Sequence, residues 1–228
     1  NLIPELLSSG HEVVTLVREE SLTNRLPEEV ERVKGDLLSP STYAEALEKI
    51  DAVVHLAAVN GSDVAEEKLK NVNITGTARI LEAAAEANVS SFVFTSTLFA
   101  HPKIPAEDAN SDLYVETKVE AQNIVRSYDH CFQTTVLHPS YIVGPKDYNL
   151  KRAAPFLRVD RNRLLLPPLY TPGRWNLVDV EDVVHAIVQS IDGVGNGHQV
   201  LTGPTVDTVT LYRAIAEATD RGCRIPRV

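Results

Sequence analysis

Tyr114 and Lys118 are the two residues whose types and spacing most clearly suit catalysis. Four residues apart on a helix, a phenol and an ammonium group emerge on the same face. A neighbouring positive charge favours the phenolate, so we expect Lys118 to lower the pKa of Tyr114 from its ordinary value of about 10. Such a pair can move a hydroxyl proton while a hydride leaves or arrives at carbon. Tyr and Lys at this spacing also occur on solvated helix faces, so the pattern needs support from its surroundings.

A cluster of hydroxyl side chains, Thr95-Ser96-Thr97, ends the apolar run that precedes this helix. The run is predicted to be a strand, and open parallel sheets bind ligands at the carboxyl ends of their strands. A hydroxyl there could hydrogen-bond the substrate oxygen that Tyr114 protonates. The alternative is that these side chains only cap the following loop. Together, the hydroxyl cluster and the Tyr-Lys pair favour catalysis.

The elements that must position these residues alternate between short apolar strands and longer helical stretches. This alternation indicates βαβ units and predicts a doubly wound, Rossmann-like α/β fold with a parallel sheet. Strands are predicted at 13–17, near 33, and at 52–58, 92–96, 134–138, 175–178 and 199–202. Helices are predicted at 2–7, 41–50, 66–87, 113–128, 181–191 and 211–219, with a Pro-rich connector at 145–173.

The composition excludes several classes of function. The 228 residues carry a net charge of −9 with dispersed Lys and Arg, which argues against nucleic-acid binding. No apolar run approaches the roughly 20 residues of a membrane span, so we expect a soluble, cytoplasmic protein. Cys131 and Cys223 lie far apart without a CxxC motif, which fits a reducing compartment. The histidines lack ligand spacing, so no metal site is expected.

The order of short motifs resembles that of the extended short-chain dehydrogenase/reductases, the NAD-dependent epimerase/dehydratase family. This superfamily includes sugar-nucleotide epimerases, dehydratases, dihydroflavonol reductases and 3β-hydroxysteroid dehydrogenases. The resemblance extends over essentially the whole chain. The matching stretches are Gly35-Asp36-Leu37, His55-Leu56-Ala57-Ala58, Asn73-Ile74-Thr75-Gly76-Thr77, Phe92 to Thr97, Tyr114 to Lys118, His138 to Pro145 and Asn176 to Val183.

The resemblance implies a role for each catalytic candidate. Tyr114 would be the acid/base, and Lys118 would bind the nicotinamide ribose and lower the pKa of the phenol. Thr97 stands where the family places its Ser or Thr, with Ser96 as the adjacent candidate. Asn73 matches the family's structural Asn behind the site, although helix capping or solvent exposure would explain it equally well.

The resemblance also implies cofactor contacts. Asp36 would approach the adenine, although ordinary turn formation is an equal alternative. The remaining cofactor candidates are Leu37, Leu56, Ala57, Ala58, Pro139 and Ser140, with the backbone after Pro139 meeting the carboxamide. Arg18 ends the second strand of the nucleotide-binding unit, where Arg suits a 2′-phosphate and an acidic residue would favour NAD. NADP is therefore the expected cofactor, with NAD as the alternative if Arg18 is simply a solvent-exposed strand end.

Parts of the family pattern differ in this chain. The first strand and its glycine-rich turn are missing before Asn1, so we expect the natural protein to extend beyond both ends. Leu98-Phe99 replaces the Asp-Glu pair of sugar-nucleotide dehydratases, which disfavours that chemistry. His101-Pro102 and His138-Pro139 replace the Tyr-Gly and Arg-Pro of many epimerases, which weakens the epimerase interpretation.

The predicted domains are a dinucleotide-binding domain at 1–144 and 175–203, and a partial substrate-binding subdomain at 145–174 and 204–228. Tyr141 and Arg174 are candidate contacts of a small-molecule substrate, for which a nucleotide sugar is one option.

The leading hypothesis is an NAD(P)-dependent oxidoreductase acting on a carbonyl or secondary alcohol. The alternatives are a sugar-nucleotide epimerase and a non-catalytic NADP-binding sensor or scaffold. By analogy with the family, a homodimer is expected through the helices at 66–87 and 114–128.

Overall fold

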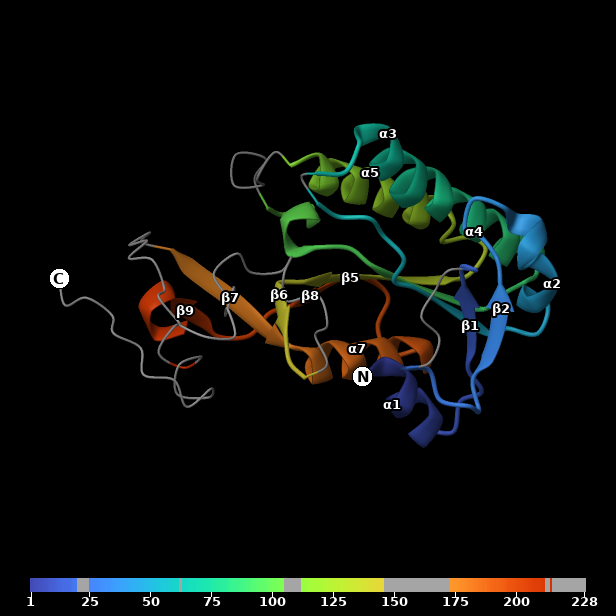
Figure 1. The fold of residues 1–228 in the computed structure, drawn as a ribbon, viewed down its shortest axis with the longest axis horizontal. Helices are drawn as coiled ribbons and strands as arrows, with labels where there is room; N and C mark the ends of the chain where they lie inside the picture. The colour runs from blue at the N-terminus through green and yellow to red at the C-terminus, as the bar shows by residue number, and fades with distance from the viewer. Residues whose placement is uncertain (20–24, 62, 105–111, 146–172, 212–213, 215–228) are drawn as a thin grey trace.

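The computed structural model describes the chain except for residues 20–24, 62, 105–111, 146–172, 212–213 and 215–228 (Figure 1). The strands are β1 (Val14–Val17), β2 (Glu31–Lys34), β3 (Ala52–His55), β4 (Ser91–Thr95), β5 (Gln133–Pro139), β6 (Tyr141–Val143), β7 (Arg174–Asp179), β8 (Gly197–Leu201) and β9 (Thr205–Asp207). The α-helices are α1 (Leu2–Ser8), α2 (Ala44–Leu47), α3 (Glu66–Lys70), α4 (Gly76–Glu86), α5 (Leu113–Ser127) and α7 (Val180–Ile191), with short 3-10 or π turns η2 (Pro40–Thr42), η3 (Asn71–Thr75) and η4 (Leu98–Ala100).

The central sheet has the strand order β3-β4-β5-β8, and every neighbouring pair is parallel. A second sheet pairs β1 with β2 in parallel. In a third sheet, β7 is parallel to β6 and antiparallel to β9. Parallel strands need crossover connections, and here these are mostly helical, so helices lie on both faces of the central sheet (Figure 1). The predicted doubly wound parallel α/β fold is therefore confirmed.

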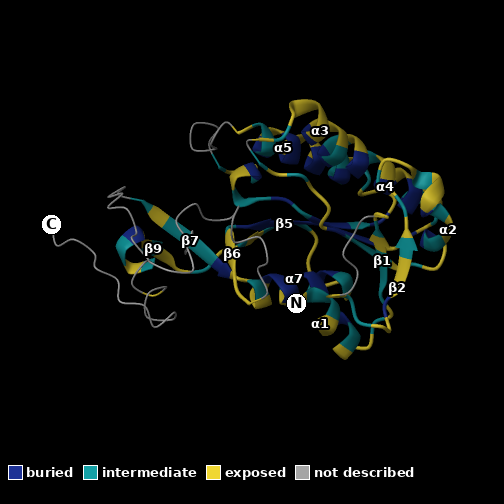
Figure 2. Cartoon of the chain, viewed as in Figure 1, coloured by how far each residue is buried: buried dark blue, intermediate teal, exposed yellow. Residues whose placement is uncertain are grey.

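Strand β4 is buried on both faces, and its neighbour β5 is also drawn as buried in the middle of the molecule (Figure 2). Phe92 and Phe94 pack under α4 and α5, whereas Val93 packs on the other face with Ile187 of α7. All three β4 side chains are fully buried. Burying a side chain of this size contributes about 1.5–3 kcal/mol relative to leaving it exposed. The two-sided burial explains why this strand is a nearly continuous apolar run in the sequence.

Two predicted helices differ from the structure. The predicted helix at 66–87 consists of α3, the π-helical turn η3 and α4, and it ends at Asn88 in a left-handed conformation. Such π turns widen a helix locally and frequently occur at functional sites. The predicted helix at 41–50 is divided into η2 and the single turn α2, because Tyr43 between them departs from helical geometry.

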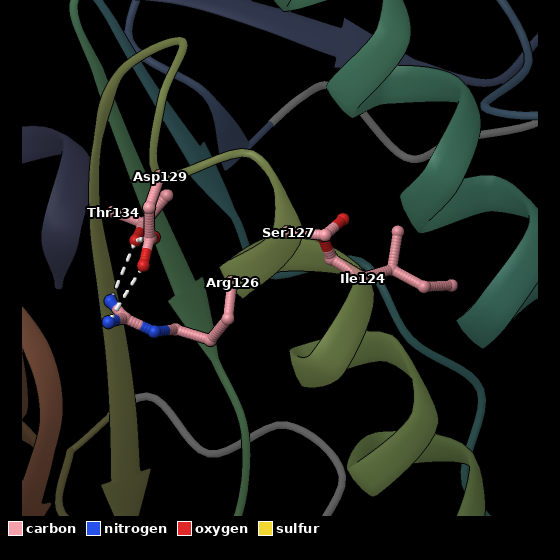
Figure 3. A network of polar contacts seen from close by, with 5 residues as sticks. All are labelled: Ile124, Arg126, Ser127, Asp129 and Thr134. Carbon is pink, nitrogen blue, oxygen red and sulfur yellow. Dashed lines mark hydrogen bonds and ion pairs between the residues drawn. The ribbon is translucent and has the colours of Figure 1, made fainter.

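Helix α5 is fastened at both ends. At its start, Asp112 Oδ1 accepts a hydrogen bond from Tyr114 N at 3.1 Å. At its end, Arg126 forms an ion pair with Asp129 at 2.7 Å and donates to Thr134 Oγ1 of β5 at 3.0 Å (Figure 3). Thr134 Oγ1 donates in turn to Asp129. The contacts of Arg126 tie the end of this helix, which carries Tyr114 at its start, to strand β5 of the central sheet.

Among the described residues, no helix is long and apolar enough to span a membrane. In the same part of the chain, no group of three or more His, Cys, Asp or Glu side chains is placed to hold a metal ion. Most of the predicted connector at 145–173 and of the predicted helix at 211–219 lies outside the described residues.

Candidate active site

Lys118 lies on the inner face of α5, toward the edge of the central sheet where β3, β4 and β5 end, which we call the carboxyl edge. Only 3% of Lys118 is exposed, and its Nζ sits 4.0 Å from the centre of the Phe94 ring. Burial lowers the pKa of Lys118 to about 7. No salt bridge to Lys118 is found among the described residues. The ammonium group is therefore available to bind an oxygen-rich ligand.

Tyr114 lies one turn before Lys118 on α5 and is half-buried. Its pKa is raised, first by burial and then by the negative charge of Asp112. The expectation that the pKa of Tyr114 falls below its ordinary value is therefore wrong. The physical reason is that desolvation disfavours both charged forms, the phenolate and the ammonium ion. In this state the Tyr114 phenol is a proton donor.

Asn73, in the π-helical turn η3, connects two parts of the candidate site. Its Oδ1 accepts from Val59 N at 2.7 Å, and its Nδ2 donates to Val59 O at 2.9 Å. The second Nδ2 hydrogen is donated to Thr117 Oγ1 at 3.0 Å, and Thr117 donates to Tyr114 O at 2.7 Å. All donors of the Asn73 amide are used. Asn73 therefore holds the segment after β3 against the first turn of α5.

A buried pair supports the η3 turn from below. Thr77 Oγ1 donates to the Asn73 carbonyl at 2.6 Å, and His55 Nε2 lies 2.9 Å from Thr77 Oγ1. Since the Thr77 proton is already used, His55 Nε2 must be the donor. Burial, with a smaller effect of the Lys118 charge, lowers the pKa of His55 to about 3. His55 therefore stays neutral and keeps the hydrogen bond in place.

The hydroxyl cluster after β4 has divided roles. Ser96 is buried, and its hydroxyl donates to Gln122 Oε1 at 3.0 Å, while Gln122 Nε2 donates to Ala100 O at 2.7 Å. Ser96 thus anchors the loop to α5. Thr97, directly after Ser96, is partly exposed at the carboxyl edge. Thr95 Oγ1 is buried and has no hydrogen-bond partner among the described residues.

Several of the predicted cofactor contacts lie beyond the ends of β1, β2 and β3. Leu56, Ala57 and Ala58 are exposed where β3 ends, as a surface under a ligand must be. Arg18 is exposed just after β1.

Asp36 Oδ1 accepts from Leu38 N at 2.8 Å, which is the turn-forming alternative considered above. Leu37 packs so closely on α4 that a Cβ at Gly76 would lie 2.6 Å from its side chain.

The predicted carboxamide and substrate contacts follow β5. Pro139 is buried, and Ser140 N donates a hydrogen bond to Leu201 O at 3.0 Å. Ser140 Oγ is buried and without a hydrogen-bond partner among the described residues, so it is the free polar atom of this segment. The Tyr141 ring packs edge-on against Trp175, with 5.2 Å between the ring centroids. Arg174 is exposed at the start of β7.

These features fit a nicotinamide dinucleotide. Lys118 offers a buried cation for ribose hydroxyls, and exposed small residues follow β3. Ser140 and Thr95 offer hydroxyls near the carboxyl ends of β5 and β4. Ligands of doubly wound sheets bind at this edge.

A hollow of about 570 Å³ lies elsewhere, around residues 129–133 and 193–196. It is at the start of β5, opposite the carboxyl edge, so we do not assign it to this site.

Comparison with known proteins identifies the family. The model of the "NAD dependent epimerase/dehydratase family" matches residues 1–202. A 3 beta-hydroxysteroid dehydrogenase/Delta 5-->4-isomerase from Mycobacterium tuberculosis is 32% identical over 171 residues, which covers 67% of this chain and 46% of that protein. The human sterol-4-alpha-carboxylate 3-dehydrogenase, decarboxylating, is 28% identical over 201 residues, or 81% of this chain and 52% of that protein. The chain thus spans about half the length of these relatives.

Solved structures agree on the fold. The UDP-glucose 4-epimerase of Thermus thermophilus in complex with NAD has a TM-score of 0.76 and 20% identity, and the match covers 100% of this chain and 81% of that one. At this identity the likeness concerns the fold alone. From the match of the family model over residues 1–202, we conclude that the chain belongs to the NAD-dependent epimerase/dehydratase family.

Proposed function

We propose that the intact protein is an NAD(P)-dependent dehydrogenase that transfers a hydride between its cofactor and a secondary alcohol or carbonyl. The observation that carries this proposal is Lys118, a buried cation without a salt-bridge partner among the described residues, one helical turn from Tyr114. Perturbed pKa values cluster at functional sites, so a desolvated lysine beside a tyrosine at a ligand-binding edge supports a catalytic role for the pair. The relatives named as 3β-hydroxysteroid and sterol dehydrogenases make 3β-hydroxysteroids the first substrate class to test.

The proposed mechanism is clearest in the direction of carbonyl reduction. A nicotinamide dinucleotide held by Lys118 and the segment after β3 would supply a hydride for the carbonyl carbon. Tyr114, whose raised pKa keeps it protonated, donates its phenolic proton to the carbonyl oxygen, which leaves an alcohol and a phenolate. Protonated Lys118, one turn away, lowers the cost of that phenolate, and the Thr97 hydroxyl donates a hydrogen bond to the substrate oxygen. Asn73 holds the η3 turn against α5 so that these groups keep their spacing.

Several finer points belong to this proposal. Arg18, exposed where β1 ends, supports acceptance of NADP through its 2′-phosphate, with NAD as the alternative. The outer faces of α4 and α5 are the proposed homodimer contact, and the cytoplasm is the proposed location. The roles of Leu56, Ala57 and Ala58 under the cofactor are part of the same proposal.

The test measures absorbance at about 340 nm, where the reduced nicotinamide absorbs, while the intact protein is incubated with a 3β-hydroxysteroid and either NAD⁺ or NADP⁺. We expect cofactor reduction in proportion to steroid oxidised. Tyr114→Phe should lower kcat by roughly a hundredfold or more, the scale of a lost general acid/base, with cofactor binding unchanged. The matched control is Tyr128→Phe, at the other end of the same helix. Epimerisation of UDP-glucose without net cofactor reduction would contradict the proposal, and so would full activity of Tyr114→Phe.

A further inference from the structure

Three histidines from separate segments meet beside Thr97. His138 Nδ1, from β5, lies 2.9 Å from the Thr97 carbonyl oxygen, and His138 Nε2 lies 2.8 Å from His198 Nδ1 of β8. The ring of His101, directly after η4, stands edge-on to His138 at a centroid distance of 4.8 Å. His138 is fully buried, whereas His198 is exposed. A hydrogen-bonded path thus runs from the surface of β8 to the backbone of the catalytic candidate.

The hydrogen-bond partners define which nitrogen carries each proton. A backbone carbonyl only accepts, so His138 Nδ1 must donate to Thr97 O. A neutral His138 then has a bare Nε2, which must accept from His198 Nδ1–H. Thr97 O also accepts from Ala100 N at 3.0 Å, so both of its lone pairs are used. The Thr97 peptide group is therefore held from two sides.

The charges around the pair keep it neutral. Burial is the main reason why the pKa of His138 is lowered to about 4; the hydrogen bond to the Thr97 carbonyl opposes this shift, and the charges of His101, His198 and Lys118 contribute to it. Burial also lowers the pKa of His198, aided by Arg126, while Asp129 opposes this. Burial lowers the pKa of His101, and the positive charge of Lys103 adds to this effect. The pair can take up one proton and keep its hydrogen bond. A second proton would leave both His138 Nε2 and His198 Nδ1 as donors, so the hydrogen bond between them would be lost.

We propose that His138 is a positioning residue that orients Thr97 through its Nδ1–H bond to the Thr97 carbonyl, with its tautomer set by His198. Only the kinetic consequence of this inference rests on the proposed dehydrogenase function. If Thr97 binds the substrate oxygen, a rotation of its peptide group moves the hydroxyl away from that oxygen. Even a small displacement of this kind lowers the rate of the reaction. The substrate and cofactor need not contact His138 at all.

The direct test reads the tautomers by nitrogen-15 NMR of histidine-labelled protein, with signals assigned through the His138→Gln and His198→Gln variants. Between about pH 7 and pH 8, both residues should be neutral with a protonated Nδ1 and a bare Nε2. A protonated Nε2 with a bare Nδ1 on His138 would overturn the proposal, because the Thr97 bond could not then exist. An imidazolium at His138 in this range would also overturn it. This readout requires no substrate.

The kinetic test compares two amides at position 138. Asn places its NH₂ group near the position of the imidazole Nδ1, whereas Gln places it near Nε2. His138→Gln should lower kcat by roughly ten- to a hundredfold with cofactor Kd unchanged, and His138→Asn should restore most of the loss. The matched control is His185→Gln on the exposed face of α7.

Equal losses in the Asn and Gln variants, or a parallel fall in cofactor binding, would show a merely structural role. An inactive wild-type protein with the expected tautomers would contradict the proposed dehydrogenase function alone.

Discussion

The buried ammonium group of Lys118 should make the stability of the protein depend on pH, because burying its charge opposes folding. Its side chain is 3% exposed and has a folded-state pKa of about 7 against an ordinary value of 10.5. Between these values the unfolded chain binds more protons than the folded one, so the free energy of unfolding rises with pH. At about pH 7 the cost of the buried ammonium is on the order of 4 kcal/mol. Its contact with Phe94 recovers only about 1–2 kcal/mol.

Lys118→Met removes the ionisable group while keeping an unbranched side chain of similar length. We therefore expect the variant to be more stable than the wild type at about pH 7. The difference should shrink by about 3 kcal/mol as the pH rises to about 9.5, because the wild-type lysine is neutral there in the folded state. Urea unfolding of the intact protein without cofactor, analysed by linear extrapolation at several pH values, measures both quantities.

The matched control is Lys68→Met, since Lys68 is exposed on α3. It should show a nearly constant difference from the wild type across the same pH range. A difference for Lys118→Met that does not change with pH would contradict the lowered pKa of Lys118, because it would mean that the ammonium group is solvated. A variant less stable than the wild type at about pH 7 would refute it equally.

Further predictions concern the surroundings of the site. Thr77→Val leaves the buried His55 donor unpaired and should destabilise the protein by about 1–3 kcal/mol in urea unfolding, whereas Thr77→Ser should cost much less. Gly76→Ala should cost about 1–3 kcal/mol in the same assay, since its Cβ would lie 2.6 Å from a leucine side chain; unchanged stability would contradict the close packing. Asp112→Asn removes a charge that raises the pKa of Tyr114, so the basic limb of the pH-activity profile should move to lower pH. A limb that stays in place would exclude that influence.

The sequence pattern predicted the strands of the central sheet well. The predicted strand at 92–96 is observed as β4 within one residue of its bounds, because two-sided burial demands the continuous apolar run seen there. Tyr114 and Lys118 lie on one helix, as their spacing predicted. Local periodicity carries this information directly, so both features could be predicted without knowledge of the fold.

Features that depend on tertiary environment could not be predicted from the pattern. The rise in the pKa of Tyr114 follows from the depth of burial, which residue spacing does not reveal. The π turn η3 lies inside a stretch that was predicted to be one continuous helix, and its place is fixed by tertiary contacts such as those of Asn73. The meeting of His138 with His198 joins residues 60 positions apart on neighbouring parallel strands. The histidines lack the spacing of metal ligands, and a hydrogen-bonding role such as that of His138 has no sequence spacing of its own.

The cofactor site at the carboxyl edge is tested most directly by calorimetric titration of the intact wild-type protein and its Lys118→Met variant with NADPH and with NADH. We expect the wild type to bind a nicotinamide dinucleotide, more tightly for NADPH if Arg18 contacts a 2′-phosphate, and the variant to lose much of this affinity. A preference for NADH would overturn the role of Arg18 alone. Absence of binding by either dinucleotide, or equal binding by Lys118→Met, would contradict the assignment of the carboxyl edge as a cofactor site.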